Sequence, residues 1–311
     1  MRVVFFGTPQ FAVPCLTALL DTGVDVVAVV TQPDRPRTRS HSTLLPPPVK
    51  VRALTGNIPV WQPERPRDEP FWGQVRGLGA DLGVVVAYGH LLRPELLVLP
   101  RLGFVNVHAS LLPRWRGAAP IQWALLAGDA ETGVAIMRVE AGLDTGAVWH
   151  ERETAISQLD TAGTLTERLS HLGADALLEA LPRIAAGVPP VPQGDAGITH
   201  APKITRELAR IRWHEPAASV SCRIRAMDPA PGAWTTLAGA EIKIRGAPAG
   251  AQHAAPRHEP GTIIGAGPAV IVTTGLGGTV GITDVQPAGK RRMPAAEWLR
   301  GANLADGARF E

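Results

Sequence analysis

The sequence contains few cysteines, few aromatic residues and no long apolar run. Its two cysteines, Cys15 and Cys222, fit neither a zinc-binding spacing nor a disulfide framework, so we expect a reducing, cytoplasmic location. No stretch approaches the roughly 20 apolar residues of a transmembrane helix. The apolar N-terminal run ends at Gly7 and Pro9, far short of a signal peptide. We therefore expect a soluble protein that does not interact with a membrane.

The composition is that of a globular protein, with 45% hydrophobic and 19% charged residues, and the 311-residue length predicts two domains. The formal net charge of +3 is unevenly distributed. From Pro190 onward, 14 lysines and arginines stand against 10 aspartates and glutamates. A basic C-terminal part favours a polyanionic partner, although on charge alone a solvated surface without a partner is the simpler explanation.

Short apolar runs alternate with helical patterns in the first half of the chain. Strands are expected at residues 3–6, 26–30, 82–87 and 104–107, and a long amphipathic helix at 164–186. All-apolar strands separated by helices predict an α/β fold: a Rossmann-like, mostly parallel sheet with helices on both faces. Ligands of such sheets bind beyond the carboxyl ends of the strands, so the ends at Gly7, Tyr88 and Asn106 are the places to look.

The first strand is followed by a turn that resembles a dinucleotide-binding loop only in part. Gly7 supplies the first glycine of the G-x-G-x-x-G fingerprint, and the other two are missing. We expect Thr8 to cap a helix whose first residue is Pro9. Pro9 also removes a backbone N–H where a pyrophosphate would bind, so a nicotinamide or flavin is not expected.

The pattern changes at Ile211, where short strands separated by glycine and proline replace the alternation of strands and helices. Together with one helix at 219–226, these strands predict a small OB-like β-barrel, and residues 247–260 are expected to form an extended loop. We therefore divide the chain into a domain at 1–189, a linker at 190–208 and a second domain at 209–311.

The polar residues at the end of the run at 104–107 have the character of a catalytic strand end. Asn106 and His108 are two residues apart, so in a strand they project from the same face. An amide can donate two hydrogen bonds, and an imidazole exchanges protons near neutrality. This pair suits acyl transfer, in which a carbonyl oxygen gains negative charge. A polar strand end without chemistry is the alternative.

The segment that follows closely resembles the methionyl-tRNA formyltransferase family. It reads Ser-Leu-Leu-Pro-Arg-Trp-Arg-Gly-Ala-Ala-Pro-Ile-Gln over residues 110–122. The Asn-x-His, Ser-Leu-Leu-Pro and Leu-Asp-x-Gly elements resemble formyltetrahydrofolate-dependent formyltransferases in general. Residues 118–122 and the basic C-terminal domain are what indicate initiator tRNA. The resemblance covers essentially the whole chain and extends through segments 7–9, 31–36, 86–89, 128–134, 142–146 and 285–290.

This resemblance implies transfer of the formyl group of 10-formyltetrahydrofolate to the α-amino group of methionyl-initiator-tRNA, for translation initiation. By matching position, Asn106 would donate to the oxyanion. His108 would donate to the same oxygen or carry protons. Asp144 would orient the imidazole and help to accept the proton of the amine, although a glycine-flanked turn such as 140–146 also uses aspartate merely to stabilise itself. No metal is expected, because the nine histidines show no ligand spacing.

The family's folate-binding segment corresponds to Ser110, Leu111, Leu112 and Pro113. Two leucines and a rigid proline offer a flat apolar edge for a pterin and an aminobenzoyl ring, and ordinary packing at the base of a loop is the alternative.

The residues predicted to bind tRNA are basic and lie in three places. They are Arg35, Arg37 and Arg39 in the first loop, Lys203 and Arg206 in the linker, and Arg210, Arg212, Arg223, Arg225, Lys243 and Arg245 in the barrel. The first loop departs from the family, which usually has Gly-Arg-Gly-Lys-Lys-Leu there. This chain keeps one arginine, Arg39, and has neither the lysines nor the glycines. We expect the protein to be a monomer.

Two other functions are compatible with parts of the sequence. A formyltransferase acting on a small amine, such as an amino sugar or a purine precursor, could use the same three residues, although the purine type would lack residues 209–311. A non-catalytic RNA-binding module with a vestigial Rossmann half is the second possibility. The joint presence of Asn106, His108 and Asp144 argues against it.

Overall fold

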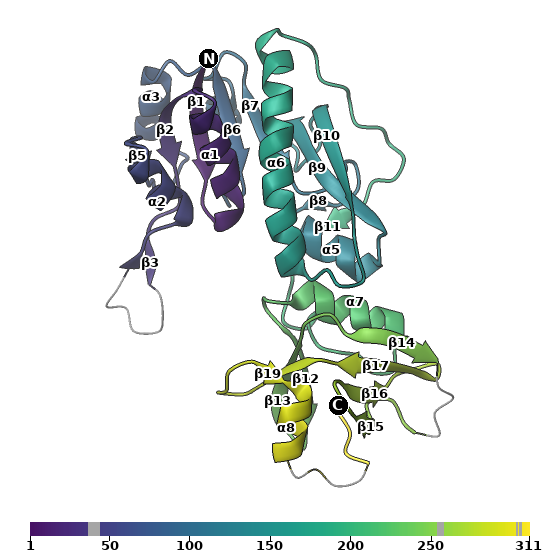
Figure 1. The fold of residues 1–311 in the computed structure, drawn as a ribbon. Helices are drawn as coiled ribbons and strands as arrows, with labels where there is room; N and C mark the ends of the chain where they lie inside the picture. Colours follow the sequence, from purple (N-terminus) through teal and green to yellow (C-terminus); the bar gives the residue numbers. More distant parts are fainter. Residues whose placement is uncertain (37–43, 254–257, 303, 305–306) are drawn as a thin grey trace. The chain divides into compact units, whose positions relative to one another are not determined.

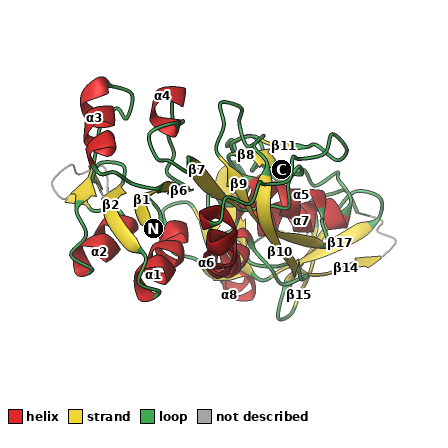
Figure 2. Ribbon diagram, turned by 90° about the horizontal axis from the view of Figure 1, so that it is seen from above, coloured by secondary structure: helices red, strands yellow, loops and turns green. Residues whose placement is uncertain are grey.

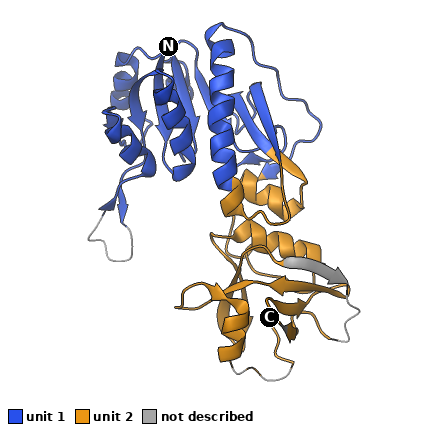
Figure 3. Cartoon of the chain, in the orientation of Figure 1, with its two compact units in different colours: residues 1–117, 133–154, 166–200 blue, residues 118–132, 155–165, 201–311 orange. Residues whose placement is uncertain are grey.

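The computed structural model describes residues 1–36, 44–253, 258–302, 304 and 307–311, so Arg37 and Arg39 lie outside the described residues. The chain divides into two compact units (Figures 1 and 3). Unit 1 consists of residues 1–117, 133–154 and 166–200, and unit 2 of residues 118–132, 155–165 and 201–311. Residues 190–200 thus group with unit 1 and residues 201–208 with unit 2. The division into 1–189, 190–208 and 209–311 stays a prediction.

The centre of unit 1 is a seven-stranded sheet in the order β10-β9-β7-β6-β1-β2-β5. Neighbouring strands from β7 to β5 pair in parallel, and β9 pairs with β7 in antiparallel fashion. The predicted mostly parallel sheet is therefore confirmed. The strands are β1 (Arg2–Gly7), β2 (Asp25–Val30), β5 (Val60–Trp61), β6 (Leu82–Val86), β7 (Phe104–His108), β9 (Glu131–Arg138) and β10 (Val148–Ala155).

Helices cover both faces of this sheet. Figure 2 shows α3 and α4 on one face and α1, α2 and α6 on the other. A hairpin of β3 (Arg35–Pro36) and β4 (Leu44–Leu45) precedes α2. The helices are η1 (Gln10–Ala12), α1 (Val13–Asp21), α2 (Pro48–Thr55), α3 (Glu69–Gly77), α4 (Pro94–Leu97) and α6 (Ala162–Ala185), and two short strands are β8 (Arg116–Gly117) and β11 (His200–Ala201).

The core beneath α3 and α4 contains several edge-to-face contacts between aromatic rings. Phe6 of β1 makes T-shaped contacts with Phe71, Tyr88 and Phe104, at centroid distances of 5.3 to 6.4 Å. Tyr88 is only 1% exposed, so it belongs to this core, and burial raises the pKa of its hydroxyl. Aromatic pairs in such edge-to-face arrangements stabilise the core beyond the apolar area that they bury.

The loops after β1, β2 and β6 are joined at the carboxyl edge of the sheet. Thr8 Oγ1 donates to the carbonyl oxygen of Tyr88 over 3.2 Å, and Gln32 Nε2 donates to the same oxygen over 3.0 Å. Thr8 therefore ties two loops together and does not cap a helix. The expectation of a helix beginning at Pro9 is wrong, because a turn of 3₁₀ helix comes first and α1 begins at Val13.

Unit 2 contains a small domain of antiparallel strands in the part of the chain where a small OB-like β-barrel is predicted. Its strands form two four-stranded sheets, β12-β13-β18-β19 and β14-β17-β16-β15, and α7 contacts strands of both. The loop expected at 247–260 contains a strand, β14. The elements are α5 (Pro120–Ala127), α7 (Ala217–Met227), α8 (Ala295–Gly301), β12 (Ala233–Leu237), β13 (Ala240–Arg245), β14 (Ala249–His253), β15 (Ile263–Ala266), β16 (Val270–Thr273), β17 (Gly278–Ile282), β18 (Asp284–Pro287) and β19 (Met293–Pro294).

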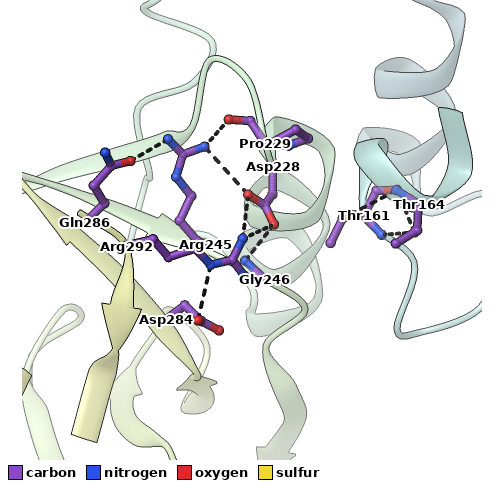
Figure 4. Close-up of polar contacts among 9 residues, drawn as sticks. All are labelled: Thr161, Thr164, Asp228, Pro229, Arg245, Gly246, Asp284, Gln286 and Arg292. Carbon is purple, nitrogen blue, oxygen red and sulfur yellow. Dashed lines mark hydrogen bonds and ion pairs between the residues drawn. The ribbon is translucent and has the colours of Figure 1, made fainter. Parts of the chain in front are cut away.

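A buried carboxylate organises the polar interior of unit 2 (Figure 4). Asp228 is 4% exposed, and its oxygens accept from the backbone N–H of Gly246 over 3.0 Å and from Arg292 Nη1 over 3.2 Å. Arg245 Nη1 lies 3.6 Å from the other oxygen. Burial lowers the pKa of the Arg245 guanidinium, and the charge of Asp228 opposes that change. Two cations and one backbone donor leave this buried charge compensated.

Candidate active site

The predicted catalytic strand end is the C-terminal end of β7. In β7, Asn106 pairs with Met137 of β9 and His108 pairs with Ala135. The pairing is regular, so the two polar side chains project from the same face of the sheet. His108 is 5% exposed, whereas Asn106 is half-buried. Its amide makes no side-chain hydrogen bond with any residue in the described ranges, so its two donors are free for a ligand.

His108 is held on one side by the loop that follows it. Its Nε2 lies 2.9 Å from the carbonyl oxygen of Trp115. A carbonyl oxygen only accepts, so this contact places a hydrogen on Nε2. Nδ1 then remains as the ring atom that faces the rest of the site. Trp115 adopts a φ of 61°, a left-handed conformation that is uncommon for a residue with a side chain.

Asp144 is brought to His108 by the fold. Its Oδ2 lies 3.7 Å from His108 Nδ1 and accepts the backbone N–H of Gly117 over 2.9 Å. The turn that carries it connects β9 to β10, and Asp144 itself has a φ of 52°. The separation of 3.7 Å is too long for a hydrogen bond and close enough for electrostatic interaction. The three residues predicted to be catalytic are thus neighbours at one strand end.

The segment predicted to bind folate is fixed largely by its own contacts. Ser110 is 1% exposed and donates from Oγ to the carbonyl oxygen of Arg114 over 2.6 Å. Leu112 packs against the β9 core, and its N–H donates to Glu151 Oε1 over 3.1 Å. Leu111 and Pro113 are half-buried. The Ser110 hydroxyl and the Leu112 side chain therefore shape the loop, and Leu111 and Pro113 are the side chains with surface to offer.

The basic residues predicted to bind tRNA fall into two groups. Lys203 is exposed, and Arg206 is 66% exposed, paired with Glu241 and stacked over the Trp234 ring at 4.6 Å. By contrast, Arg223 and Arg225 are 8% and 4% exposed.

The buried arginines serve the fold. Arg223 binds the Glu215 carboxylate and the carbonyl oxygen of Leu208, and Arg225 donates to the carbonyl oxygens of Ser157 and Asp160. Arg245 is committed to the Asp228 cluster described above. These three side chains expose little surface with which to contact RNA, at 8% for Arg223, 4% for Arg225 and 11% for the side chain of Arg245, contrary to expectation.

Four further residues contribute to the site, and the sequence predicts no individual role for any of them. They are Arg116, Gly117, Gln193 and Thr199. The first two lie inside the motif segment. The other two follow a run of prolines in the predicted linker, where no periodicity marks a contact with the catalytic loop.

No group of three or more histidine, cysteine, aspartate or glutamate side chains within the described ranges is arranged to hold a metal ion. No described helix is both long and apolar enough to cross a membrane.

Comparison with known proteins agrees with this geometry. Residues 1–181 match the formyl transferase family and residues 203–303 match the formyl transferase C-terminal domain, so the fold and the site define a formyl transferase. A methionyl-tRNA formyltransferase of Halorhodospira halophila is 48% identical over 307 residues, which cover 98% of each chain. The chain therefore belongs to the methionyl-tRNA formyltransferase family.

Solved structures with the same fold are more distant in sequence. HypX from Aquifex aeolicus, in complex with tetrahydrofolic acid, aligns with 96% of this chain and 47% of its own at a TM-score of 0.63 and 19% identity. WlaRD, a sugar 3N-formyl transferase, aligns with 94% of this chain and 99% of its own at a TM-score of 0.67 and 16% identity. At such identities the likeness demonstrates a shared fold.

Proposed function

We propose that this protein transfers the formyl group of 10-formyltetrahydrofolate to the α-amino group of methionyl-initiator-tRNA, giving formylmethionyl-tRNA for translation initiation. One observation carries the proposal: the Asp144 carboxylate lies 3.7 Å from the His108 imidazole, on the strand face that also carries Asn106, whose amide has no side-chain partner among the described residues. The full-length relative named methionyl-tRNA formyltransferase supports the acceptor. HypX, whose fold is shared and whose structure contains tetrahydrofolic acid, supports a folate donor.

In this mechanism Asn106 stabilises the charge that develops on the formyl oxygen. When the neutral amine adds to the formyl carbon, that oxygen becomes an oxyanion. A preorganised amide donor stabilises it more than water does, because the donor needs no reorganisation during the reaction. Asn106 suits this role, since its amide is half-buried and has no competing partner among the described residues.

His108 and Asp144 handle the proton that the amine must lose. Because Nε2 is engaged by the Trp115 carbonyl, Nδ1 is the atom that takes part, facing Asp144 Oδ2. The gap of 3.7 Å leaves room for an ammonium hydrogen to be shared between the two groups as the bond forms. The proton then passes to the nitrogen of the departing folate, and tetrahydrofolate leaves.

The remaining contacts are assigned by position. Leu111 and Pro113 offer apolar surface to the pterin and aminobenzoyl rings, with Ser110 and Leu112 shaping the loop. Lys203 and Arg206, with Arg37 and Arg39 of the first loop, are assigned to tRNA phosphates. We further propose a monomer in the cytoplasm that needs no metal for this reaction.

The substrate test offers radiolabelled 10-formyltetrahydrofolate to the purified protein with three acceptors in separate reactions. These are methionyl-initiator-tRNA, an amino-sugar nucleotide and an aminated purine precursor. The amino sugar is included because WlaRD shares the fold. We expect label in the tRNA only, released as formylmethionine after mild alkaline hydrolysis. Label in a small amine and none in the tRNA would replace the proposal with its alternative. Label in no acceptor would overturn both.

A further inference from the structure

The side chain of Gln193 uses its full hydrogen-bonding capacity on the active-site loops. Its Nε2 donates to the carbonyl oxygen of Asp144 over 3.0 Å and to that of Gly146 over 2.8 Å. Its Oε1 accepts from Arg116 Nε over 2.9 Å and from Arg116 Nη2 over 2.6 Å. An amide offers two donors and one oxygen with two lone pairs, so no part of this side chain is left over.

These bonds hold a turn that needs support. Asp144 has a φ of 52°, a backbone conformation that a non-glycine residue keeps only where its surroundings hold it. Gln193 binds the carbonyls on both sides of Thr145 and so clamps the turn from outside. The same side chain holds Arg116, whose neighbour Gly117 donates its N–H to the Asp144 carboxylate. Both segments that determine where this carboxylate points therefore meet at Gln193.

A second residue of the same segment holds the other side of His108. Thr199 Oγ1 accepts the backbone N–H of Trp115 over 2.8 Å, and the Thr199 carbonyl oxygen accepts the N–H of Arg116 over 3.0 Å. The carbonyl of Trp115 is the group that accepts from His108 Nε2. The chain from 193 to 199 thus supports the loop that orients the imidazole as well as the turn that carries the carboxylate.

From these contacts we infer that Gln193 is a positioning residue of the formyl-transfer site, which keeps the Asp144 carboxylate facing His108. The inference rests on the proposed function. Gln193 acts through Asp144 and needs no contact with either substrate.

Two substitutions test the inference by different routes. Gln193→Leu removes all four bonds. Gln193→Glu keeps the acceptor for Arg116 but turns a carboxylate oxygen toward two carbonyl oxygens. Since displacing a catalytic group by about 1 Å costs up to ~100-fold, we expect kcat to fall ~10- to 100-fold in both, with little change in KM for either substrate. If the leucine variant does not fold, the glutamate variant still provides the test. The control is Gln74→Leu on the exposed surface of α3, with kcat unchanged.

A double-mutant cycle separates positioning from general support of the fold. If Gln193 acts through Asp144, Gln193→Leu should cost little further activity once Asp144→Asn is present. Equal fold-losses in the two backgrounds would overturn the inference, because a merely structural role lowers both rates by the same factor.

Hydrogen exchange supplies a readout that does not depend on turnover. The Gly117 amide is bonded to Asp144 Oδ2, so its exchange should be faster in Gln193→Leu than in the wild type or in Gln74→Leu. Wild-type kcat and unchanged Gly117 exchange in both Gln193 variants would overturn the inference and leave the proposed function standing. If the wild type formylates no acceptor, the proposed function fails, and exchange alone decides whether Gln193 holds the turn.

Discussion

Asp144 in unit 1 and Asp228 in unit 2 are both shielded carboxylates, yet they are satisfied in different ways. Each accepts one backbone N–H, from Gly117 over 2.9 Å and from Gly246 over 3.0 Å. Asp228 is 4% exposed and adds two guanidinium partners. Asp144 is half-buried and adds an imidazole at 3.7 Å.

The difference separates a carboxylate suited to a structural role from one suited to the proton transfer that we propose. The negative charge of Asp228 is neutralised by two arginines, so its burial is compensated and its lone pairs are occupied. Asp144 faces the His108 imidazole across a gap of 3.7 Å and keeps acceptor capacity for the proton that the amine loses in the proposed mechanism. The two aspartates are thus both shielded from solvent and differ in whether arginine side chains neutralise the carboxylate.

The largest expected effect is the loss of activity on removal of the reactive carboxylate or of the oxyanion donor. Asn106→Ala should lower kcat at least ~100-fold, the usual loss for one oxyanion donor, and Asp144→Ala should lower it at least ~100-fold through the loss of proton transfer, while the thermal midpoint of each stays close to that of the wild type. Steady-state formylation assays and thermal melts measure the two quantities. Near-wild-type turnover by either purified variant would contradict the catalytic assignment.

The second expected effect is a loss of stability without a loss of activity when the carboxylate of Asp228 is removed. Asp228→Asn keeps an acceptor for the Gly246 N–H but leaves the Arg245 guanidinium, 11% exposed, facing a neutral partner. We expect a loss of about 3 kcal/mol in the free energy of unfolding, limited because solvent screens the half-exposed Arg292. Denaturant titration measures this loss. The kcat per folded molecule should be unchanged, and a stable variant with low kcat would make the two aspartates alike.

The smallest expected effect concerns a third carboxylate, Asp34, on the surface of unit 1. Hydrogen bonds from Lys50 and Gln62 lower the pKa of Asp34 below its usual value. A depressed folded-state pKa stabilises the fold above the unfolded pKa of about 3.9, and the contribution is lost as the pH falls through the folded value. Asp34→Asn should therefore be slightly less stable than the wild type at pH 7, and the difference should shrink on approaching pH 3. A constant difference across this range would argue against the ion pair.

Much of the fold could be predicted because repetition is visible in sequence. The apolar strands of unit 1 are rich in valine, a β-branched residue that favours strands. Because side chains alternate along a strand, Asn106 and His108 could be placed on one face. The sequence predicts a loop where β14 lies, because Ala-Gly-Ala-Gln-His contains no Val, Ile, Thr, Phe, Tyr or Trp, the residues that favour strands. The burial of Arg223 and Arg225 was also missed, since a guanidinium satisfied by carbonyl oxygens has no sequence signal.

The site was predictable only where its members are close in sequence or belong to a recognised motif. Asp144 could be predicted only from the family motif that surrounds it. Its contact with His108 depends on how the fold places the turn between β9 and β10, which no local pattern in the sequence shows. Gln193 and Thr199 escaped prediction for a physical reason. Their contacts join side chains to backbone atoms or to single partners, and such bonds impose no period on the sequence.

The contacts of Gln193 and Thr199 also determine when the active-site loops can be fixed during synthesis of the chain. A chain that stops at residue 189 contains Asn106, His108 and Asp144 and lacks the groups bonded to the Asp144 turn and to the Trp115 backbone. A nascent chain emerging from the ribosome would therefore contain all three of these residues before it could form the hydrogen bonds that position them. Completion of the proposed catalytic centre would then wait until Gln193 and Thr199 have also been synthesised.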